Sequence, residues 1–473
     1  MQNNKLLNNS LNIILKGTLK LFLCSLITLS AFKAIAVGEV NKDRQEYLTA
    51  RTMLGVIPRQ AGLGVKVVIR AVAPNSTAVV MGIKPNDKLL TIDNQEIPDF
   101  GGLINLLSNK KVNESVRFSV ERDGKIIILE GKMQARTQEK SDNAKVVYDT
   151  VFWNKQRLRS IIYTPNQVLK ENSKAPAIFY IQGYTCDSID YGYSPNITTL
   201  QLINQFVKAG YVVYRAEKFG VGDSKGAMQC RDVNFTEEVA GFTAALRELK
   251  KHPSVNPKEV YLWGHSLGVL AAPAIAKQEK VAGIIGYGGV AKSWHDYILD
   301  IYFDQAVTYF GTDKVVARNN VETIKPFVHD WLKTKMPWKE LLKNEKTIKS
   351  GLMPITEEQV FNRHYTFFRD LNKYDFPKLW KEIQVPTLMI HGSFDIQAVN
   401  EKWAFDIAKS VNKGGRNLGK AMIVENAEHA LMHYENIQEN LDERSNNQYN
   451  PGRPGKRFET KIGEKTIKWI ENL

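Results

Sequence analysis

Cysteine is scarce in this chain of 473 residues, which contains Cys24, Cys186 and Cys230 and no other. No pair of them has the Cys-X-X-Cys spacing of a zinc or redox site, and no His-Glu-X-X-His motif or acidic cluster offers metal-ligand spacing. We therefore expect neither a metal nor a cofactor.

Long apolar runs and nucleic-acid-binding patterns are also missing. No stretch approaches 18 consecutive apolar residues, so we expect no membrane span in the mature protein. The formal net charge is +14, but the Lys and Arg residues are scattered among acids and do not alternate with aromatic residues as in known DNA- or RNA-binding modules. The sequence predicts a solvated surface and no nucleic-acid partner, and leaves open a general attraction to anionic surfaces.

The N-terminus indicates export. Residues 1–20 are polar with lysines, residues 21–32 are apolar, and residues 34–36 form a small-X-small pattern. Twelve apolar residues are too few to cross a bilayer, so we predict a signal peptide over residues 1–36, cut after Ala36. An anchor that is kept is the alternative. Cleavage removes four lysines and no acid, lowers the charge to +10, and places the protein in the periplasm or outside the cell.

Export makes the remaining cysteines interpretable. After cleavage only Cys186 and Cys230 are left, an even pair in an oxidising compartment. We expect a disulfide between them, with two buried thiols as the alternative.

A compact β-rich unit is predicted over residues 50–135. Its strand at 65–70 is followed by Pro-Asn-Ser-Thr-Ala at 74–78, Gly-Ile-Lys-Pro-Asn-Asp at 82–87, a short helix at 103–107 and an Asp-Gly hairpin turn at 123–124. This order of elements resembles a bacterial PDZ domain.

The PDZ resemblance implies a peptide-binding site. In that family the backbone amides of a Leu-Gly loop bind a peptide C-terminus while the ligand adds a strand. Here Leu54, Gly55 and Val56 would form this loop, and residues 103–107 would line the groove. Asn86 departs from the family's usual Gly, which is tolerable because Asn accepts positive φ. The alternative is a domain that only packs against the catalytic body.

Beyond a polar linker at 134–145, residues 146–473 predict an α/β domain. Strands and helices alternate, which is typical of a mostly parallel sheet. Residues 291–380 interrupt the alternation and hold 16 of the chain's 46 aromatic residues. We expect an inserted helical cap there, whose aromatic residues either line a substrate site or form the cap's own core.

The strand at 260–263 runs into Gly-X-Ser-X-Gly at 264–268, and a helix of small residues follows. Strand, sharp turn and helix form the context of a nucleophile elbow, with Ser266 exposed at the turn. Two later strands end at Asp395 and just before His429. The chain therefore resembles an α/β-hydrolase, in the order Ser, Asp, His.

The resemblance implies a role for each group. Ser266 is the nucleophile, His429 its general base and acid, and Asp395 orients the imidazole. The oxyanion hole would use the backbone N–H of Leu267 and one N–H near Gly183 or Tyr184.

Three other residues were weighed against this triad. Asp223 lies before the elbow in sequence, so we interpret it as structural. His433 is expected on the helix after His429, and His391 within a buried strand. Gln182 stands where the family usually has His, which leaves the backbone role of the loop intact.

The sequence thus predicts an exported serine hydrolase that cleaves a carboxylic ester or similar acyl bond of a small molecule. A serine peptidase or amidase acting on peptides is the first alternative. The second is a non-catalytic protein that binds a peptide or protein C-terminus through the PDZ-like groove.

Overall fold

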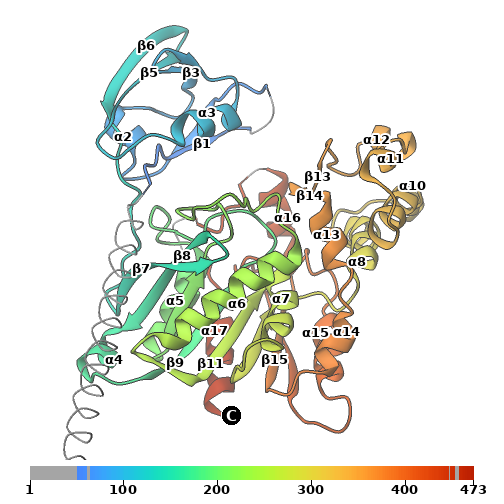
Figure 1. Cartoon of the computed structure of the whole chain (residues 1–473). Coiled ribbons are helices and arrows are strands. Elements are labelled where there is room, and N and C mark those ends of the chain that lie inside the picture. Colours follow the sequence, from blue (N-terminus) through green and yellow to red (C-terminus); the bar gives the residue numbers. More distant parts are fainter. Residues whose placement is uncertain (1–50, 61–63, 447, 453–456) are drawn as a thin grey trace, which may run out of the picture. The chain divides into compact units, whose positions relative to one another are not determined.

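The computed structural model describes residues 51–60, 64–446, 448–452 and 457–473 (Figure 1). The predicted signal peptide, residues 1–36, lies outside the described residues. Within the described residues, no helix combines the length and the apolar character needed to cross a membrane.

The PDZ region contains two small sheets, β1-β2 and β4-β3-β5-β6, all of whose pairings are antiparallel. Its elements are β1 (Val56–Pro58), β2 (Ile69–Val72), α2 (Thr77–Met81), β3 (Lys88–Ile92), β4 (Gln95–Glu96), α3 (Phe100–Leu107), β5 (Ser115–Arg122) and β6 (Lys125–Lys132). Leu103 of α3 is buried in the core of this region, whereas Ile104 is exposed. Leu103 therefore cannot line a groove as expected, because it is already packed inside.

The α/β domain, called the body below, is built on an eight-stranded sheet of order β16-β15-β12-β11-β9-β10-β8-β7. Only the β7-β8 and β8-β10 pairings are antiparallel. The strands are β7 (Ala144–Trp153), β8 (Gln156–Pro165), β9 (Ala175–Ile181), β10 (Val212–Ala216), β11 (Val255–His265), β12 (Gly283–Tyr287), β15 (Thr387–Gly392) and β16 (Gly419–Val424).

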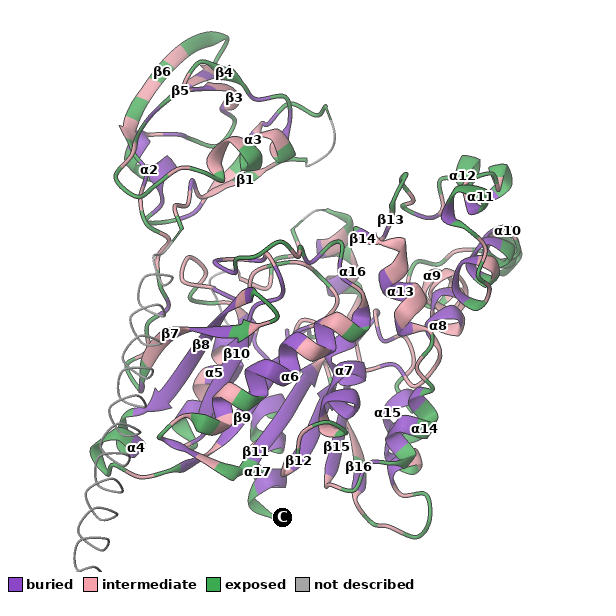
Figure 2. Ribbon diagram, in the orientation of Figure 1, coloured by how far each residue is buried: buried purple, intermediate pink, exposed green. Residues whose placement is uncertain are grey.

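The central strands are apolar on both faces because both faces are covered (Figure 2). Successive side chains of a strand point to opposite sides of the sheet. In β9, Phe179 and Ile181 pack into the core cluster shared with α6 and α7, and Ile178 and Tyr180 into the cluster shared with α5 and α17. This explains why the parallel strands are continuous apolar runs.

The helices of the body follow the sheet strands in the expected alternation. They are α4 (Asn166–Lys170), α5 (Thr198–Lys208), α6 (Phe235–Lys251), α7 (Leu267–Ala276), α15 (Lys402–Val411), α16 (Ile437–Ser445) and α17 (Lys461–Glu471). Asn234 and Glu237 form a capping box at the start of α6.

Between β12 and β15 the chain forms the expected helical insertion. It consists of α8 (Trp294–Asp300), the π-helix η1 (Ile301–Gln305), α9 (Ala306–Thr308), α10 (Lys314–Lys333), α11 (Trp338–Leu341), α12 (Glu345–Ser350), β13 (Gln359–Val360), β14 (Arg363–His364), α13 (Tyr365–Leu371) and α14 (Phe376–Lys381).

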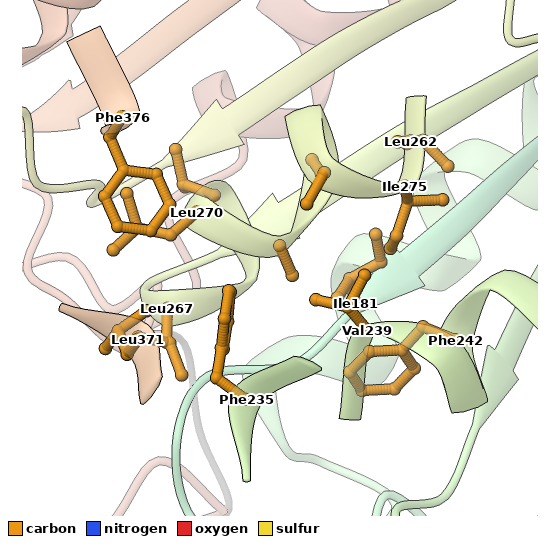
Figure 3. Packing of buried hydrophobic residues seen from close by; sticks show 14 of the residues in the cluster. Ile181, Phe235, Val239, Phe242, Leu262, Leu267, Leu270, Ile275, Leu371 and Phe376 are labelled. Atoms are coloured by element: carbon orange, nitrogen blue, oxygen red, sulfur yellow. The ribbon is translucent and has the colours of Figure 1, made fainter. Parts of the chain in front are cut away.

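The insertion shares its core with the body. Figure 3 shows Leu267 and Leu270 of α7 beside Leu371 and Phe376 of the insertion. Many of its aromatic residues, such as Trp331, are fully buried in this cluster. Trp331 contacts other rings of the insertion, such as Trp338 and Phe368, whereas Phe367 and Phe376 pack against Phe235 of α6. The aromatic residues therefore form the insertion's own core and also attach it to α6.

Candidate active site

Ser266 occupies a sharp turn between β11 and α7, with φ 55° and ψ −121°. Two glycines make this turn possible. A Cβ on Gly264 would lie 2.5 Å from the carbonyl oxygen of Gly268, and a Cβ on Gly268 would lie 2.2 Å from that of Ile181. The backbone can approach this closely only where no side chain intervenes, so the local sequence dictates the turn.

Asp395 and His429 form a buried pair at the ends of β15 and β16. The Nδ1 of His429 lies 2.7 Å from Oδ2 of Asp395. The other carboxylate oxygen accepts the backbone N–H groups of Gln397 and Ala398, each at 2.9 Å. With Nδ1 engaged, Nε2 is the ring nitrogen left to exchange a proton with a substrate or nucleophile.

Burial disfavours the charged form of both groups, but their mutual attraction outweighs it. His429 and the backbone amides hold the pKa of Asp395 well below the usual carboxyl range. The Asp395 carboxylate in turn raises the pKa of His429 above its ordinary value, despite burial. The pair is therefore suited to stabilise an imidazolium.

Backbone contacts bring the elbow and this pair together. The N–H of Ser266 donates to the carbonyl oxygen of Tyr287, at 2.9 Å. The next residue, Gly288, has φ 63°, and a Cβ there would lie 2.8 Å from Oδ2 of Asp395 and 2.9 Å from Nδ1 of His429. The chain beside the nucleophile thus lies directly against the Asp–His pair.

His265, the residue before the nucleophile, provides a second connection. Its Nε2 lies 2.7 Å from the carbonyl oxygen of His429, and its Nδ1 lies 3.2 Å from the hydroxyl of Tyr180. Burial, and then the nearby His429, lower the pKa of His265 to about 4. The ring is neutral at neutral pH, so Nε2 donates to the carbonyl and Nδ1 accepts from Tyr180.

The loop after β9 reaches the other side of the serine. A Cβ on Gly183 would lie 3.1 Å from Cβ and 3.5 Å from Oγ of Ser266. The predicted disulfide is present at the end of this loop, with the sulfur atoms of Cys186 and Cys230 2.00 Å apart. It ties the loop to the segment that leads into α6.

Two buried cations hold the same loop. Lys218 donates to the carbonyl oxygens of Gly183 and Thr185, and Arg363 to that of Tyr184 at 2.7 Å. Both cations pair with Glu238 of α6.

An aromatic row extends from this loop along the insertion. The ring of Tyr184 lies 6.2 Å from that of Phe368, which stacks on Trp294 at 5.2 Å. Trp294 contacts Tyr297, at 4.7 Å, and the Tyr297 hydroxyl donates to the carbonyl of Gln397, two residues after Asp395. The row thus connects the loop after β9 to the segment that follows Asp395.

The other candidates have separate partners. Asp223 pairs with Arg159 at 3.0 Å in a buried position. His433 is not on a helix as expected: it forms an isolated β-bridge with Ala427, ahead of α16. Its Nδ1 lies 2.7 Å from Glu459. His391 is buried in β15, and burial lowers its pKa.

Sequence reasoning missed Lys218, Glu238, Arg363 and His265. Lys218 lies two residues after the end of β10, and its neighbours Arg215 and Glu217 are charged as well. Three charged residues at the end of a buried strand are unusual and could have marked this position. Arg363 gives no such signal, because it lies in a charged, aromatic-rich segment whose neighbours in space are far away in sequence.

In the PDZ region, the carbonyl groups around the predicted carboxylate loop are all engaged. The carbonyl of Met53 accepts the Thr77 hydroxyl at 2.7 Å, and those of Leu54 and Gly55 accept the backbone N–H groups of Ala78 and Ala73, each at 2.8 Å. In a planar trans peptide, the N–H of the following residue points the opposite way. The amides of Leu54, Gly55 and Val56 therefore point away from these partners.

Two family models match the sequence. The model for the PDZ domain matches residues 41–132, and the model for X-Pro dipeptidyl-peptidase (S15 family) matches residues 155–430. No curated protein matches the chain.

Several solved hydrolases are similar to the chain. Est1E from Butyrivibrio proteoclasticus, solved with ferulic acid, shares 16% identity over 63% of this chain and 98% of its own, with a TM-score of 0.40. An esterase from Pyrococcus furiosus shares 15% over 69% and 92%, with a TM-score of 0.39. An esterase domain from Rhodothermus marinus shares 16% over 64% and 96%, with a TM-score of 0.38.

The fold is thus an α/β-hydrolase fold preceded by a PDZ domain, as the sequence predicts. Since the S15 model covers more than half of the sequence, the chain belongs to the X-Pro dipeptidyl-peptidase (S15) family and is a serine hydrolase of the α/β type.

Proposed function

We propose that this chain cleaves a carboxylic ester, or a similar acyl bond, through an acyl-enzyme on Ser266. The observation that carries the proposal is the buried Asp395–His429 pair, whose Nε2 is left for proton transfer beside the elbow. The hydrogen bond from Ser266 to His429 is itself part of the proposal.

The proposed reaction has two halves. Ser266 Oγ attacks the acyl carbon while His429 Nε2 takes the hydroxyl proton, and the resulting oxyanion accepts the N–H groups of Leu267 and of Tyr184 or Gly183. The C–O bond to the leaving alcohol breaks as His429 returns the proton to it. Water then attacks the acyl-enzyme with the same proton relay, which releases the acid and restores Ser266.

A peptide substrate is the second candidate, and the S15 family match favours it. The same acyl-enzyme chemistry would then release an amine instead of an alcohol.

The first experiment is labelling of the mature protein with a fluorophosphonate, beside Ser266→Ala. We expect labelling of the wild type alone. A panel of p-nitrophenyl esters from acetate to octanoate, run beside Ala-Pro-p-nitroanilide, then separates esterase from peptidase. A folded wild type that does not label would instead favour the non-catalytic peptide-binding alternative.

We also propose that the PDZ region binds a peptide C-terminus. The outward direction of the Leu54, Gly55 and Val56 amides supports this, since such a nest of N–H groups suits a carboxylate. Full-length protein should bind C-terminal peptides from a library more tightly than the same peptides with an amidated end. Equal binding would contradict the proposal.

Export to the periplasm or the medium completes the proposal. The Cys186–Cys230 disulfide supports it, because disulfides persist in oxidising compartments. N-terminal sequencing of the protein from the producing cell should begin at Val37. A start at Met1 would support a retained anchor.

A further inference from the structure

In the loop beside Ser266, three consecutive carbonyl groups accept hydrogen bonds from two buried cations. Lys218 Nζ donates to the oxygens of Gly183 and, at 3.1 Å, of Thr185. Arg363 Nη1 donates to the oxygen of Tyr184 at 2.7 Å. Each carbonyl of the loop is thus bound to a charged donor, which makes a stronger hydrogen bond than a neutral one.

The orientation of these carbonyls sets the orientation of the amides. The peptide unit that contains the Gly183 carbonyl also contains the Tyr184 N–H, on its opposite edge. When Lys218 binds the carbonyl, the Tyr184 N–H must point away from Lys218. Gly183 itself lies against Ser266: a Cβ built on Gly183 would lie 3.1 Å from the Cβ of the serine. This peptide unit is therefore the one whose rotation would most change the donors offered near Oγ.

One carboxylate keeps the two cations in place. Glu238 accepts Lys218 at 3.0 Å through one oxygen and Arg363 at 2.7 Å through the other. All three side chains are buried, with at most 3% of each exposed. Burial lowers the pKa of Lys218 to about 8 against the attraction of Glu238, whereas the two cations outweigh burial and lower the pKa of Glu238. Buried charges persist only when they are paired in this way.

Arg363 comes from the inserted helical segment, whereas Lys218 and Glu238 come from the body. Arg363 Nη1 also lies 3.4 Å from Sγ of Cys230, and its guanidinium lies 3.7 Å from the ring centre of Phe367. Its position therefore depends on both the insertion and the disulfide. A displacement of β14 would be transmitted to the Tyr184 carbonyl through one side chain.

We propose that Lys218 and Arg363, clamped by Glu238, are positioning residues of the oxyanion hole. This inference rests on the proposed acyl-enzyme function and adds to it. Lys218 fixes the peptide that presents the Tyr184 N–H, which selects Tyr184 over Gly183 as the second donor. Arg363 makes that geometry depend on the insertion.

The test compares Lys218→Met and Arg363→Lys with the wild type. Methionine keeps most of the length of the lysine side chain but cannot donate, and lysine keeps the charge of Arg363 but cannot reach all of its partners at once. Lys277→Met is the matched control, because Lys277 is half-exposed and pairs with Glu382 on the surface. Thermal unfolding of every variant checks that it is folded.

Two ketone inhibitors that carry the same acyl group distinguish a misplaced oxyanion donor from a general loss of structure. A trifluoromethyl ketone forms a tetrahedral adduct with the serine, whose oxyanion needs the hole, whereas the methyl ketone binds without it. For Lys218→Met we expect kcat to fall by roughly 10- to 100-fold with KM changed by less than about threefold, since loss of a single oxyanion donor costs 10²–10³. Affinity for the trifluoromethyl ketone should fall in parallel, and affinity for the methyl ketone should not.

Wild-type kcat and inhibitor affinities in the variants would overturn the inference, and so would an equal loss of affinity for both ketones. If Lys218→Met does not fold, Arg363→Lys decides by the same measurements, with a smaller expected loss of kcat. Failure of the wild type to react with a fluorophosphonate would instead overturn the proposed function. Reaction of the wild type and not of Ser266→Ala, with unaffected Lys218 and Arg363 variants, would overturn this inference alone.

Discussion

His265 donates a hydrogen bond of 2.7 Å from Nε2 to the backbone carbonyl oxygen of His429. The residue directly before the nucleophile thus holds the segment that carries the proposed general base. Because its pKa is lowered to about 4, by burial and then by His429, His265 keeps this neutral donor form throughout the neutral range. A second positive charge beside the His429 imidazolium is thereby avoided.

Replacement of His265 by Phe should misplace His429 while leaving it chemically intact. We expect kcat to fall by about tenfold and stability by about 1 kcal/mol, the usual net contribution of one hydrogen bond. Ester turnover and urea unfolding measure the two effects. Tyr180→Phe, which removes only the hydroxyl at 3.2 Å from Nδ1, is the milder control. A fully active His265→Phe would show that the contact is dispensable.

The activity should have an acid limb set by His429. Asp395 raises the pKa of His429 against the effect of burial, and the base works only when neutral. The ordinary pKa of His is about 6.5. We therefore expect kcat/KM to fall as the pH drops through a value above this. Asp395→Asn should shift this limb to lower pH and reduce kcat by about 10⁴. An acid limb that does not move in that variant would argue against His429 as the base.

The elbow should not tolerate a side chain at position 268. A Cβ there would meet the carbonyl oxygen of Ile181 at 2.2 Å, so Gly268→Ala must displace backbone next to Ser266. We expect loss of measurable turnover and of fluorophosphonate labelling. Gly210→Ala is a suitable control, since its φ is 91° but nothing lies within 4 Å of the added Cβ. It should cost roughly 1 kcal/mol of strain and leave turnover unchanged.

The disulfide should contribute to both stability and turnover. Cys186 and Cys230 are separated by 44 residues, and closing such a loop in the unfolded chain is worth at most about 4 kcal/mol. We expect the double variant with Ser at both positions to lose a large part of this free energy. Its turnover should also be slower, because the loop after β9, which carries the proposed second oxyanion donor, loses one anchor. Unchanged stability and turnover would show that the bridge is incidental to the site.

Glu217 should make stability depend on pH. Its carboxylate accepts the Ser188 hydroxyl and, at 3.1 Å, the N–H of Ile189, yet burial raises its pKa to about 7. A group whose pKa is raised by folding stabilises the fold fully below its unfolded pKa, about 4.3, and this contribution is lost as the pH rises through 7. Glu217→Gln should therefore gain stability relative to wild type between pH 5 and pH 8. The same difference in unfolding free energy between variant and wild type at pH 5 and at pH 8, measured by urea unfolding, would contradict this.

Much of the fold follows from local patterns in the sequence. The parallel strands are continuous apolar runs because both faces of the sheet are covered, and the capping box at Asn234 and Glu237 fixes the start of α6 by local hydrogen bonds. The Gly-X-Ser-X-Gly turn likewise depends on neighbours in the chain. The disulfide could be predicted because the predicted signal cleavage leaves a single pair of cysteines.

By itself, then, the sequence determined the two kinds of domain, the elbow at Ser266, and the order of the three proposed catalytic residues. Only the tertiary structure decided how the site is supported: the His265–His429 contact, and the clamp of Lys218, Glu238 and Arg363 on the loop after β9. The physical reason is distance along the chain. A turn or a cap is dictated by residues a few positions apart, whereas Arg363 meets Tyr184 across 179 positions, and no local pattern records which buried charges will share a carboxylate.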